Sequence, residues 1–161
     1  MATSLPKIRV PRIRVDAVEI LKREHRTFAR QFQALFAAHS AHRRRELATQ
    51  LCNELKIHFA LEEDIFFPAF VYATQDTLTR CVAFIHHESA KSLIEEIEGL
   101  DPVDSEFLGR AHALSRMISH HSNEAERPNG IFDEARTADM DWTRVGTALL
   151  ERKQALERYA D

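Results

Sequence analysis

The sequence predicts an all-α protein, built as an up-down-up-down four-helix bundle with an additional C-terminal amphipathic helix and an extended N-terminal arm. The 161 residues include only four glycines and five prolines, too few for the many turns of a sandwich or a barrel. Apolar residues recur at alternating steps of three and four along four long segments, which is the period of an α-helix. Short connections between these segments favour antiparallel neighbours.

The first helix is expected to begin at Asp16, whose side chain can cap it together with Glu19 three positions later. Its inward stripe consists of Val18, Leu21, His25, Phe28, Phe32 and Leu35. The second helix is expected over residues 42–73. Its stripe consists of Leu47, Leu51, Leu55, His58, Glu62, Ile65 and Ala69. Pro68 removes one backbone hydrogen bond, so we expect a bend near the end of this helix.

The third helix is expected over residues 76–99 and carries the doublet His86 and His87. The fourth is expected over residues 103–126, where the RPNG sequence that follows ends it. Its stripe consists of Phe107, Ala111, Leu114, Ile118 and His121. A fifth amphipathic helix, from about Asp141, is expected to cover one side of the bundle.

Composition bounds the domain organisation and the partners. Residues 1–15 form a basic, proline-punctuated arm, and residues 16–161 fit one helical bundle domain. A net charge of −3 gives no reason to expect nucleic acid, and the longest apolar run, IFFPAFVYA, is too short to span a membrane. The basic arm can mediate self-association into a homo-oligomer, but the sequence does not give the oligomeric state.

Two cysteines, Cys52 and Cys81, do not make a disulfide framework, so we expect a reducing, cytoplasmic location. In the predicted bundle they lie roughly 25 Å apart along the axis, which excludes a bridge between them.

Histidines are the unusual feature of the composition, since the chain has nine. Height in an antiparallel hairpin follows from the distance to the connecting turn, at about 1.5 Å per residue. By this measure one inward-facing histidine from each of the four helices reaches a similar level, within about one helical turn. These histidines are His25, His58, His87 and His121.

A lone core histidine is more often hydrogen-bonded than metal-bound, but convergence of several changes the argument. Each buried polar group without a partner costs on the order of 1–3 kcal/mol. A cation satisfies all of them together. Imidazole and carboxylate donors without a thiolate exclude the cysteine-rich zinc and iron–sulfur classes and suit iron, manganese or zinc. We expect two iron ions, because a carboxylate four residues from a helical histidine can bridge two metals.

Four stretches, in order along the chain, carry a family resemblance: LKREHRTF, HFALEEDIFFPAF, HHESAKSLI and the HH of MISHHSNEAE. With them and the closing segment VGTALLERKQAL, the sequence resembles hemerythrin-like proteins of the HHE cation-binding type over nearly all of residues 16–158. The resemblance implies that His25, His58, Glu62 and His87 are iron ligands, with Glu62 bridging.

On the fourth helix the resemblance leaves alternatives open. His121 keeps the core register and Glu124 follows at i+3, so these two are the expected ligands. Glu126 at i+5 can replace Glu124, and His120 with Glu124 forms an intact His-x-x-x-Glu after a small rotation of the helix. A rotated third helix would likewise exchange His87 for His86.

The resemblance also implies a coordinatively open site. Oxygen carriers place a second histidine four residues after the first on the third helix, where this chain has Lys91. Fewer protein ligands leave positions for water, oxygen or peroxide. We therefore expect a metal-binding protein that binds or senses oxygen or another small redox ligand. The alternatives are a di-iron redox enzyme acting on peroxide or nitric oxide-type oxidants, and a metal-poor adapter bundle, so whether the protein is an enzyme stays open.

Overall fold

The computed structural model describes residues 15–160, and within them every regular element is helical. The elements are α1 (Ala17–Ala37), α2 (Ala41–Leu61), a π-helical segment η1 (Glu62–Phe66), α3 (Phe67–Thr74), α4 (Thr77–Gly99), α5 (Ser105–Glu126), α6 (Ile131–Thr137) and α7 (Trp142–Ala160). The predicted all-α class is confirmed. The predicted N-terminal arm lies almost entirely outside the described residues.

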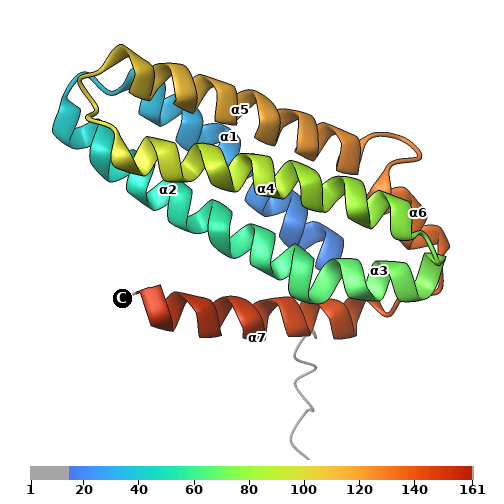
Figure 1. Ribbon diagram of the computed structural model, residues 1–161. Helices are drawn as coiled ribbons and strands as arrows, with labels where there is room; N and C mark the ends of the chain where they lie inside the picture. Colours follow the sequence, from blue (N-terminus) through green and yellow to red (C-terminus); the bar gives the residue numbers. More distant parts are fainter. Residues whose placement is uncertain (1–14, 161) are drawn as a thin grey trace, which may run out of the picture.

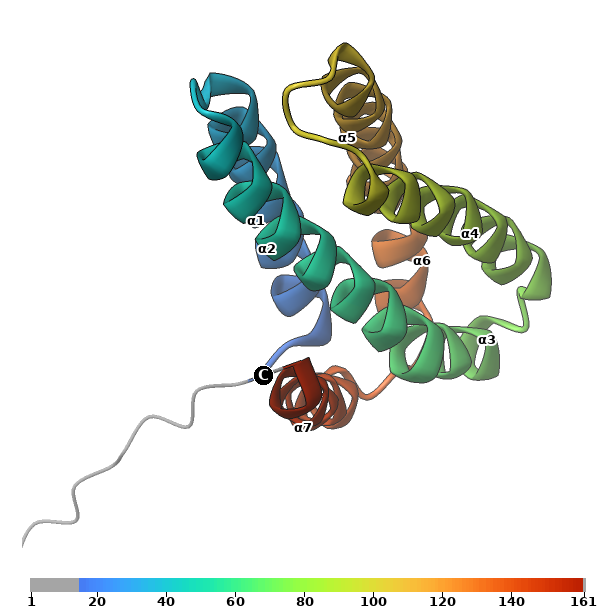
Figure 2. The same cartoon turned by 60° about the vertical axis from the view of Figure 1, so that its left-hand side comes forward.

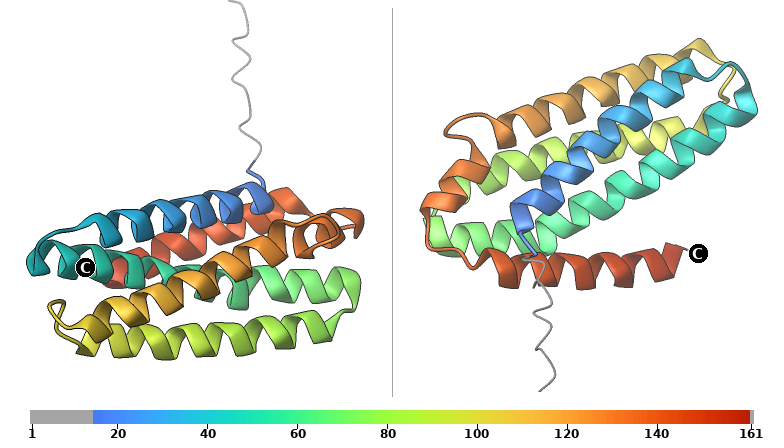
Figure 3. Two further views of the ribbon diagram at one scale, coloured as in Figure 1. Left: turned by 90° about the horizontal axis from the view of Figure 1, so that it is seen from above. Right: turned by 180° about the vertical axis from the view of Figure 1, so that it is seen from behind.

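Two helical hairpins form the bundle (Figure 1). Helices α1 and α2 make one hairpin, α4 and α5 make the other, and α5 packs back against α1. The short helix α3 continues α2, and α6 turns across the end of the bundle next to it (Figures 1 and 3). Helix α7 lies outside the bundle along α1 and α2, as the sequence predicts for the fifth amphipathic helix (Figures 1 and 2).

Helix boundaries follow local hydrogen-bonding chemistry. Asp16 caps α1 as predicted, because its Oδ1 accepts from the backbone N–H groups of Val18 and Glu19 at 2.9 and 3.2 Å. Gln75, with a φ of 62°, ends α3 in the left-handed conformation. The sequence RPNG ends α5 as expected. Helix α6 was not predicted, since its seven residues are too few to show a helical period.

The second predicted helix changes direction where α2 passes into α3 (Figures 1 and 3). The backbone is π-helical at η1, where the N–H of Phe67 donates to the carbonyl of Glu62. The bend that we predicted near the end of this helix is therefore present, and its irregular turn lies just before Pro68. Proline has no N–H to offer the carbonyl of Asp64, and the wider turn before it accommodates that missing bond.

The core consists of two apolar clusters with a polar layer between them. One cluster fills the half of the bundle that holds the α1–α2 and α4–α5 connections, and includes Phe28, Leu55 and Ile94. The other fills the opposite half beneath α6 and α7, and includes Leu21, Phe66 and Phe132. On α1, α4 and α5 the residues between the two clusters include a histidine of the predicted site, and on α2 His58 lies where the two clusters meet.

Both cysteines are free, Cys52 in the core and Cys81 on the surface, as the predicted separation requires. No helix in the described part of the chain has the length and apolar character needed to cross a lipid bilayer.

Candidate metal centre

Five polar side chains from the four bundle helices meet in the layer between the two apolar clusters. Three histidines and one carboxylate are almost fully buried, with exposed fractions of 4% for His25 and 1% for His58, Glu62 and His87. The fifth, His121, has a side chain that is 9% exposed. Helix α1 contributes His25, α2 and η1 contribute His58 and Glu62, α4 contributes His87 and α5 contributes His121.

The carboxylate of Glu62 lies at the centre of this cluster. Its Oε1 is 3.6 Å from Nε2 of His58, and its Oε2 is 3.2 Å from Nε2 of His87 and 3.3 Å from Nε2 of His121. The ring of His25 completes the group, with its centroid 5.1 Å from that of His58 and 5.4 Å from that of His121. Four of these residues each place one potential ligand atom within 4.8 Å of those of the other three: His25, His58, Glu62 and His121.

A carboxylate holds the outer nitrogen of three of the four histidines. The Nδ1···O pairs are His25 with Glu126 at 2.7 Å, His58 with Glu24 at 2.8 Å, and His87 with Glu63 at 2.9 Å. An ionised carboxylate only accepts, so each Nδ1 carries the proton and donates it. In a neutral imidazole the remaining nitrogen, Nε2, then presents a lone pair to the interior of the cluster.

These inward atoms have no hydrogen-bond partner in the described structure. They are the Nε2 atoms of His25, His58, His87 and His121 and the Oε2 atom of Glu62. Each unpaired buried acceptor lowers the free energy of unfolding by on the order of 1–3 kcal/mol. Five of them together would remove a large part of the stability of a small domain. A metal cation accepts lone pairs from every one of them. The donor set, four imidazole nitrogens and a carboxylate without thiolate, therefore fits a metal of the iron, manganese or zinc type.

Burial and neighbouring groups shift the pKa values of the cluster in different directions. Burial acts to raise the pKa of Glu62, but the surrounding imidazoles, His58 and His121 above all, outweigh it and hold that pKa well below its usual range. Burial lowers the pKa of His121 and so favours its neutral form. For His87 burial acts in the same direction, but the nearby carboxylates of Glu62 and Glu63 raise its pKa overall.

Two lysines donate hydrogen bonds to two of the carboxylates that hold the histidines. Lys153 of α7 donates to Oε1 of Glu24 at 2.7 Å, while the other oxygen of Glu24 accepts from His58. Lys91 of α4 donates to both oxygens of Glu63 at 2.9 and 3.0 Å. Lys91 stands where the oxygen carriers named in the sequence analysis have a second histidine, and here it orients Glu63, the partner of His87.

Five of the six predicted site residues come together: His25, His58, Glu62, His87 and His121. The sixth, Glu124, does not join them. Its exposed carboxylate accepts from Arg127 at 3.0 Å, because the inward position on this turn of α5 belongs to Ala125, which is 2% exposed. The alternative residue Glu126 does reach the site, but as the partner of the outer nitrogen of His25.

The doublets on α4 and α5 are also resolved. His87 and His121 point into the cluster, while His86 and His120 are exposed. The predicted core register of the two helices therefore holds, and neither of the rotated alternatives occurs.

The sequence analysis does not identify the supporting roles of Glu24 and Glu63. Both are direct neighbours of predicted ligands, His25 and Glu62, which is a weak signal that a carboxylate lies close by. Which histidine each one contacts depends on the packing of different helices, since Glu24 on α1 bonds His58 on α2. Asp64, in contrast, is exposed and pairs with Arg152.

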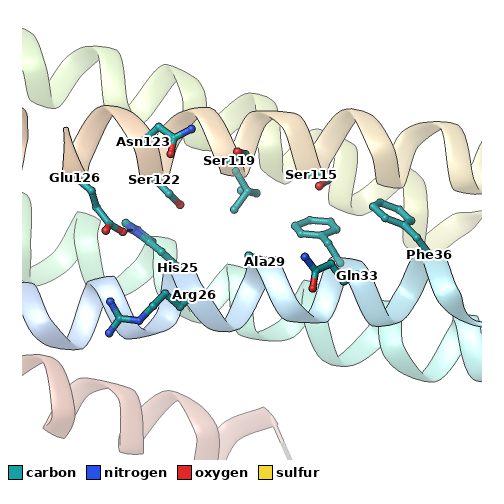
Figure 4. A pocket seen from close by; sticks show the side chains of 12 residues that line it. His25, Arg26, Ala29, Gln33, Phe36, Ser115, Ser119, Ser122, Asn123 and Glu126 are labelled. Atoms are coloured by element: carbon teal, nitrogen blue, oxygen red, sulfur yellow. Dashed lines mark hydrogen bonds and ion pairs between the residues drawn. The ribbon is translucent and has the colours of Figure 1, made fainter.

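A groove of about 370 Å³ between α1 and α5 leads to the site. His25 and its partner Glu126 lie at one end and Phe36 at the other, and hydroxyl and amide side chains line the α5 wall between them (Figure 4). The polar residues of that wall are Ser115, Ser119, Ser122 and Asn123.

Comparisons with known proteins identify a family and support the fold. The family model of the hemerythrin HHE cation-binding domain matches residues 16–128. A crystal structure of a hemerythrin HHE cation binding domain-containing protein from Mycobacterium kansasii is similar, with a TM-score of 0.75 and 23% identity over 91% of this chain and 90% of that one. At this identity the likeness shows the fold. A comparison with curated proteins gave no significant match.

Proposed function

Because the chain belongs to the family of hemerythrin HHE cation-binding domains, we propose that its buried cluster is an iron centre that binds a small redox ligand. One observation carries the metal assignment: four imidazole nitrogens and a carboxylate oxygen converge in the core, each without a hydrogen-bond partner. The carboxylates on the outer nitrogens support it, since such partners orient metal-binding histidines and fix their tautomer.

The position of Glu62 favours two ions over one. Its two oxygens face different histidines, with His58 nearest Oε1, and His87 and His121 nearest Oε2. A carboxylate placed in this way can bridge one ion held with His25 and His58 and another held with His87 and His121. Each ion would then have few protein ligands and keep open positions for an exogenous ligand.

Binding or sensing of oxygen is the function that these surroundings support best. Aromatic rings enclose the imidazoles: Phe59 stacks on His87 with centroids 4.4 Å apart, and Phe28 lies 5.1 Å from His58. An apolar shell limits water and favours a small neutral ligand such as oxygen.

A redox enzyme acting on peroxide or a nitric oxide-type oxidant is the second candidate. The groove at His25 favours it, because it offers a polar route for a substrate larger than a diatomic molecule (Figure 4). The bond between His25 and the half-exposed Glu126 also gives a path for a proton between the groove and the cluster.

Metal analysis of His58→Ala tests the assignment. We expect protein produced with iron to contain close to stoichiometric metal, and His58→Ala to lose it while its helicity is largely retained. His42→Ala is the matched control, since His42 is exposed and pairs only with Glu46. Iron content that is equal in both variants would contradict the ligand assignment.

Two measurements on the same iron-loaded protein distinguish the two candidate functions. A reversible, oxygen-dependent visible band without turnover supports binding. Peroxide consumption that His58→Ala abolishes and His42→Ala preserves supports the enzyme. A protein that folds normally and takes up no iron would exclude both candidates and leave the adapter bundle.

A further inference from the structure

We propose that His86 and His120 form an outer docking site for a divalent first-row metal ion, at the mouth of the route by which the buried cluster is loaded. The inference rests on the proposed function, because it concerns how the same centre receives its metal. Neither histidine contributes to the cluster itself.

The two histidines stand opposite each other on neighbouring helices. Each directly precedes an inward histidine, His87 on α4 and His121 on α5, and successive helical side chains diverge by about 100°. The outer pair has ring centroids 5.9 Å apart, close to the 5.1 Å that separates the inner pair. Two imidazoles that share a cation at about 2.0–2.1 Å from each nitrogen have centres roughly 5 Å apart, so a small rotation of exposed side chains suffices.

A single small pocket joins the outer pair to the inner pair. Its volume is about 170 Å³, enough for a few water molecules at about 30 Å³ each. Its lining consists of His86, His87, His120, His121, Phe59, Ala90, Met117 and Ile118. An ion at the mouth therefore meets imidazoles at both ends of the pocket and only apolar walls between them.

The surface around the outer pair favours cations. An adjoining pocket of about 420 Å³, also lined by His86 and His120, contains the carboxylates of Glu124 and Glu134 and the guanidinium of Arg127. Arg127 pairs with Glu124 at 3.0 Å, which neutralises one of the two carboxylates. The charge of Glu134 then leaves this pocket with a net negative charge. Such local negative charge raises the concentration of cations and their association rate.

The groove at His25 is a poorer route for a metal ion. It presents one imidazole, whose outer nitrogen is bonded to Glu126, and Arg26 lies along the same groove (Figure 4). Arg26 offsets the one carboxylate of this groove, Glu126, and the groove offers a cation no second imidazole. The mouth between α4 and α5 offers both attraction and a pair of ligands.

Uptake kinetics test the proposal on the full chain. Apo protein is mixed with Co²⁺, and the visible band of bound cobalt is followed with time. We expect H86A/H120A to take up cobalt about ten-fold more slowly at low cobalt concentration, with the same final number of ions in the buried cluster. H39A/H42A is the matched control, because it removes two exposed histidines from the distant α1–α2 connection. Equal rates in the three proteins, or fewer ions in the buried cluster of H86A/H120A, would overturn the proposal.

A second measurement detects the docking site directly. After the interior is filled with zinc, a small amount of Ni²⁺ is added and amide signals are recorded. We expect paramagnetic broadening around residues 86 and 120 that disappears in H86A/H120A, and broadening elsewhere or nowhere would refute the site. If the interior takes up no metal, the proposed function fails, and the same nickel experiment still decides whether the outer pair binds a cation.

Discussion

At the scale of single residues, the supporting carboxylates determine which face of each imidazole is available. Glu24, Glu63 and Glu126 each accept from a different Nδ1, so the corresponding Nε2 is left as an acceptor in the core. These contacts place three of the four imidazoles in a metal-binding tautomer. The interior of the bundle is therefore prepared for a cation by residues that need not touch it.

Thiol chemistry gives a prediction at the same scale. Burial, with a smaller contribution from the charge of Glu98, raises the pKa of Cys52 to about 12, whereas Cys81 is exposed. We expect a thiol reagent at neutral pH to modify Cys81 rapidly and Cys52 only after unfolding. Mass spectrometry of the labelled peptides measures this, with Cys81→Ser as the control. Rapid labelling of Cys52 in the folded protein would contradict its burial.

At the scale of helices, α7 does more than cover the bundle. Its Lys153 is the only described lysine or arginine that donates to Glu24, and Glu24 in turn orients His58. The fifth helix therefore reaches the site through two successive hydrogen bonds. The equivalent support for His87 comes from its own helix, because Lys91 of α4 donates to Glu63 of η1, which accepts from His87.

We predict that Lys153→Met weakens metal binding by about ten-fold, because it frees Glu24 from the geometry that holds His58. Competition with a chelator measures the change. Arg152→Met is the matched control, since Arg152 pairs with the exposed Asp64 on the surface and not with the site. Equal affinities in the two variants would show that α7 has no influence on the centre.

Helix capping gives a second prediction at this scale. Asp76 caps α4, where its side chain accepts from the backbone N–H of Thr79 at 3.0 Å, whereas Asp104 at the start of α5 makes no such bond. We expect Asp76→Ala to lower the free energy of unfolding by about 1 kcal/mol and Asp104→Ala to change it little. Denaturant unfolding of the two variants measures the difference.

The effect of Asp76 is expected to depend on pH. Hydrogen bonds from the side chain and backbone of Thr79 hold the pKa of Asp76 below its usual value. A carboxyl group with a lowered pKa in the folded state stabilises the protein above its unfolded pKa of about 3.9, and this contribution disappears as the pH falls through the folded pKa. The difference between wild type and Asp76→Ala is therefore expected to shrink in acid.

At the scale of the whole molecule, close packing between distant parts of the chain fixes α7 on the bundle. A Cβ at Gly146 would lie 2.9 Å from Cγ1 of Val15 and 3.0 Å from the backbone nitrogen of Ala17. We expect Gly146→Ala to destabilise the protein by about 1–3 kcal/mol. Gly109→Ala is the control, because its Cβ would meet nothing within 4 Å and a helical alanine is expected to stabilise by about 0.5–1 kcal/mol. Thermal unfolding compares the two variants. Equal melting temperatures would show that α7 can shift to accept the added methyl group without loss of stability.

The arrangement of the core also belongs to this scale. Two apolar clusters flank the layer of histidines, so burial of Phe, Leu and Ile side chains on both sides stabilises the fold around it. This explains why we expect His58→Ala to remain helical. The unpaired ligand atoms of the polar layer destabilise the metal-free protein. We expect bound metal to raise the free energy of unfolding by coordinating them.

Much of this protein follows from its sequence alone. The three-and-four spacing of apolar residues determines four bundle helices and a fifth that covers them, and Asp16 marks where the first begins. Periodicity also placed His25, His58, Glu62, His87 and His121 on inward faces at similar heights. Such features are local, because one helix and its length are enough to define them.

Only the tertiary structure decided the partners of these residues. The sequence does not show that Glu24 bonds a histidine on another helix, that Glu126 supports His25, or that Glu124 turns outward to Arg127. It also hides the π-turn that begins at Glu62 and holds two carboxylates, Glu62 and Glu63, that contact His87 on α4. Each of these depends on how helices rotate and pack against one another. Hydrogen bonds between helices are set by that packing to within an ångström, whereas a periodic pattern defines a face only to within tens of degrees.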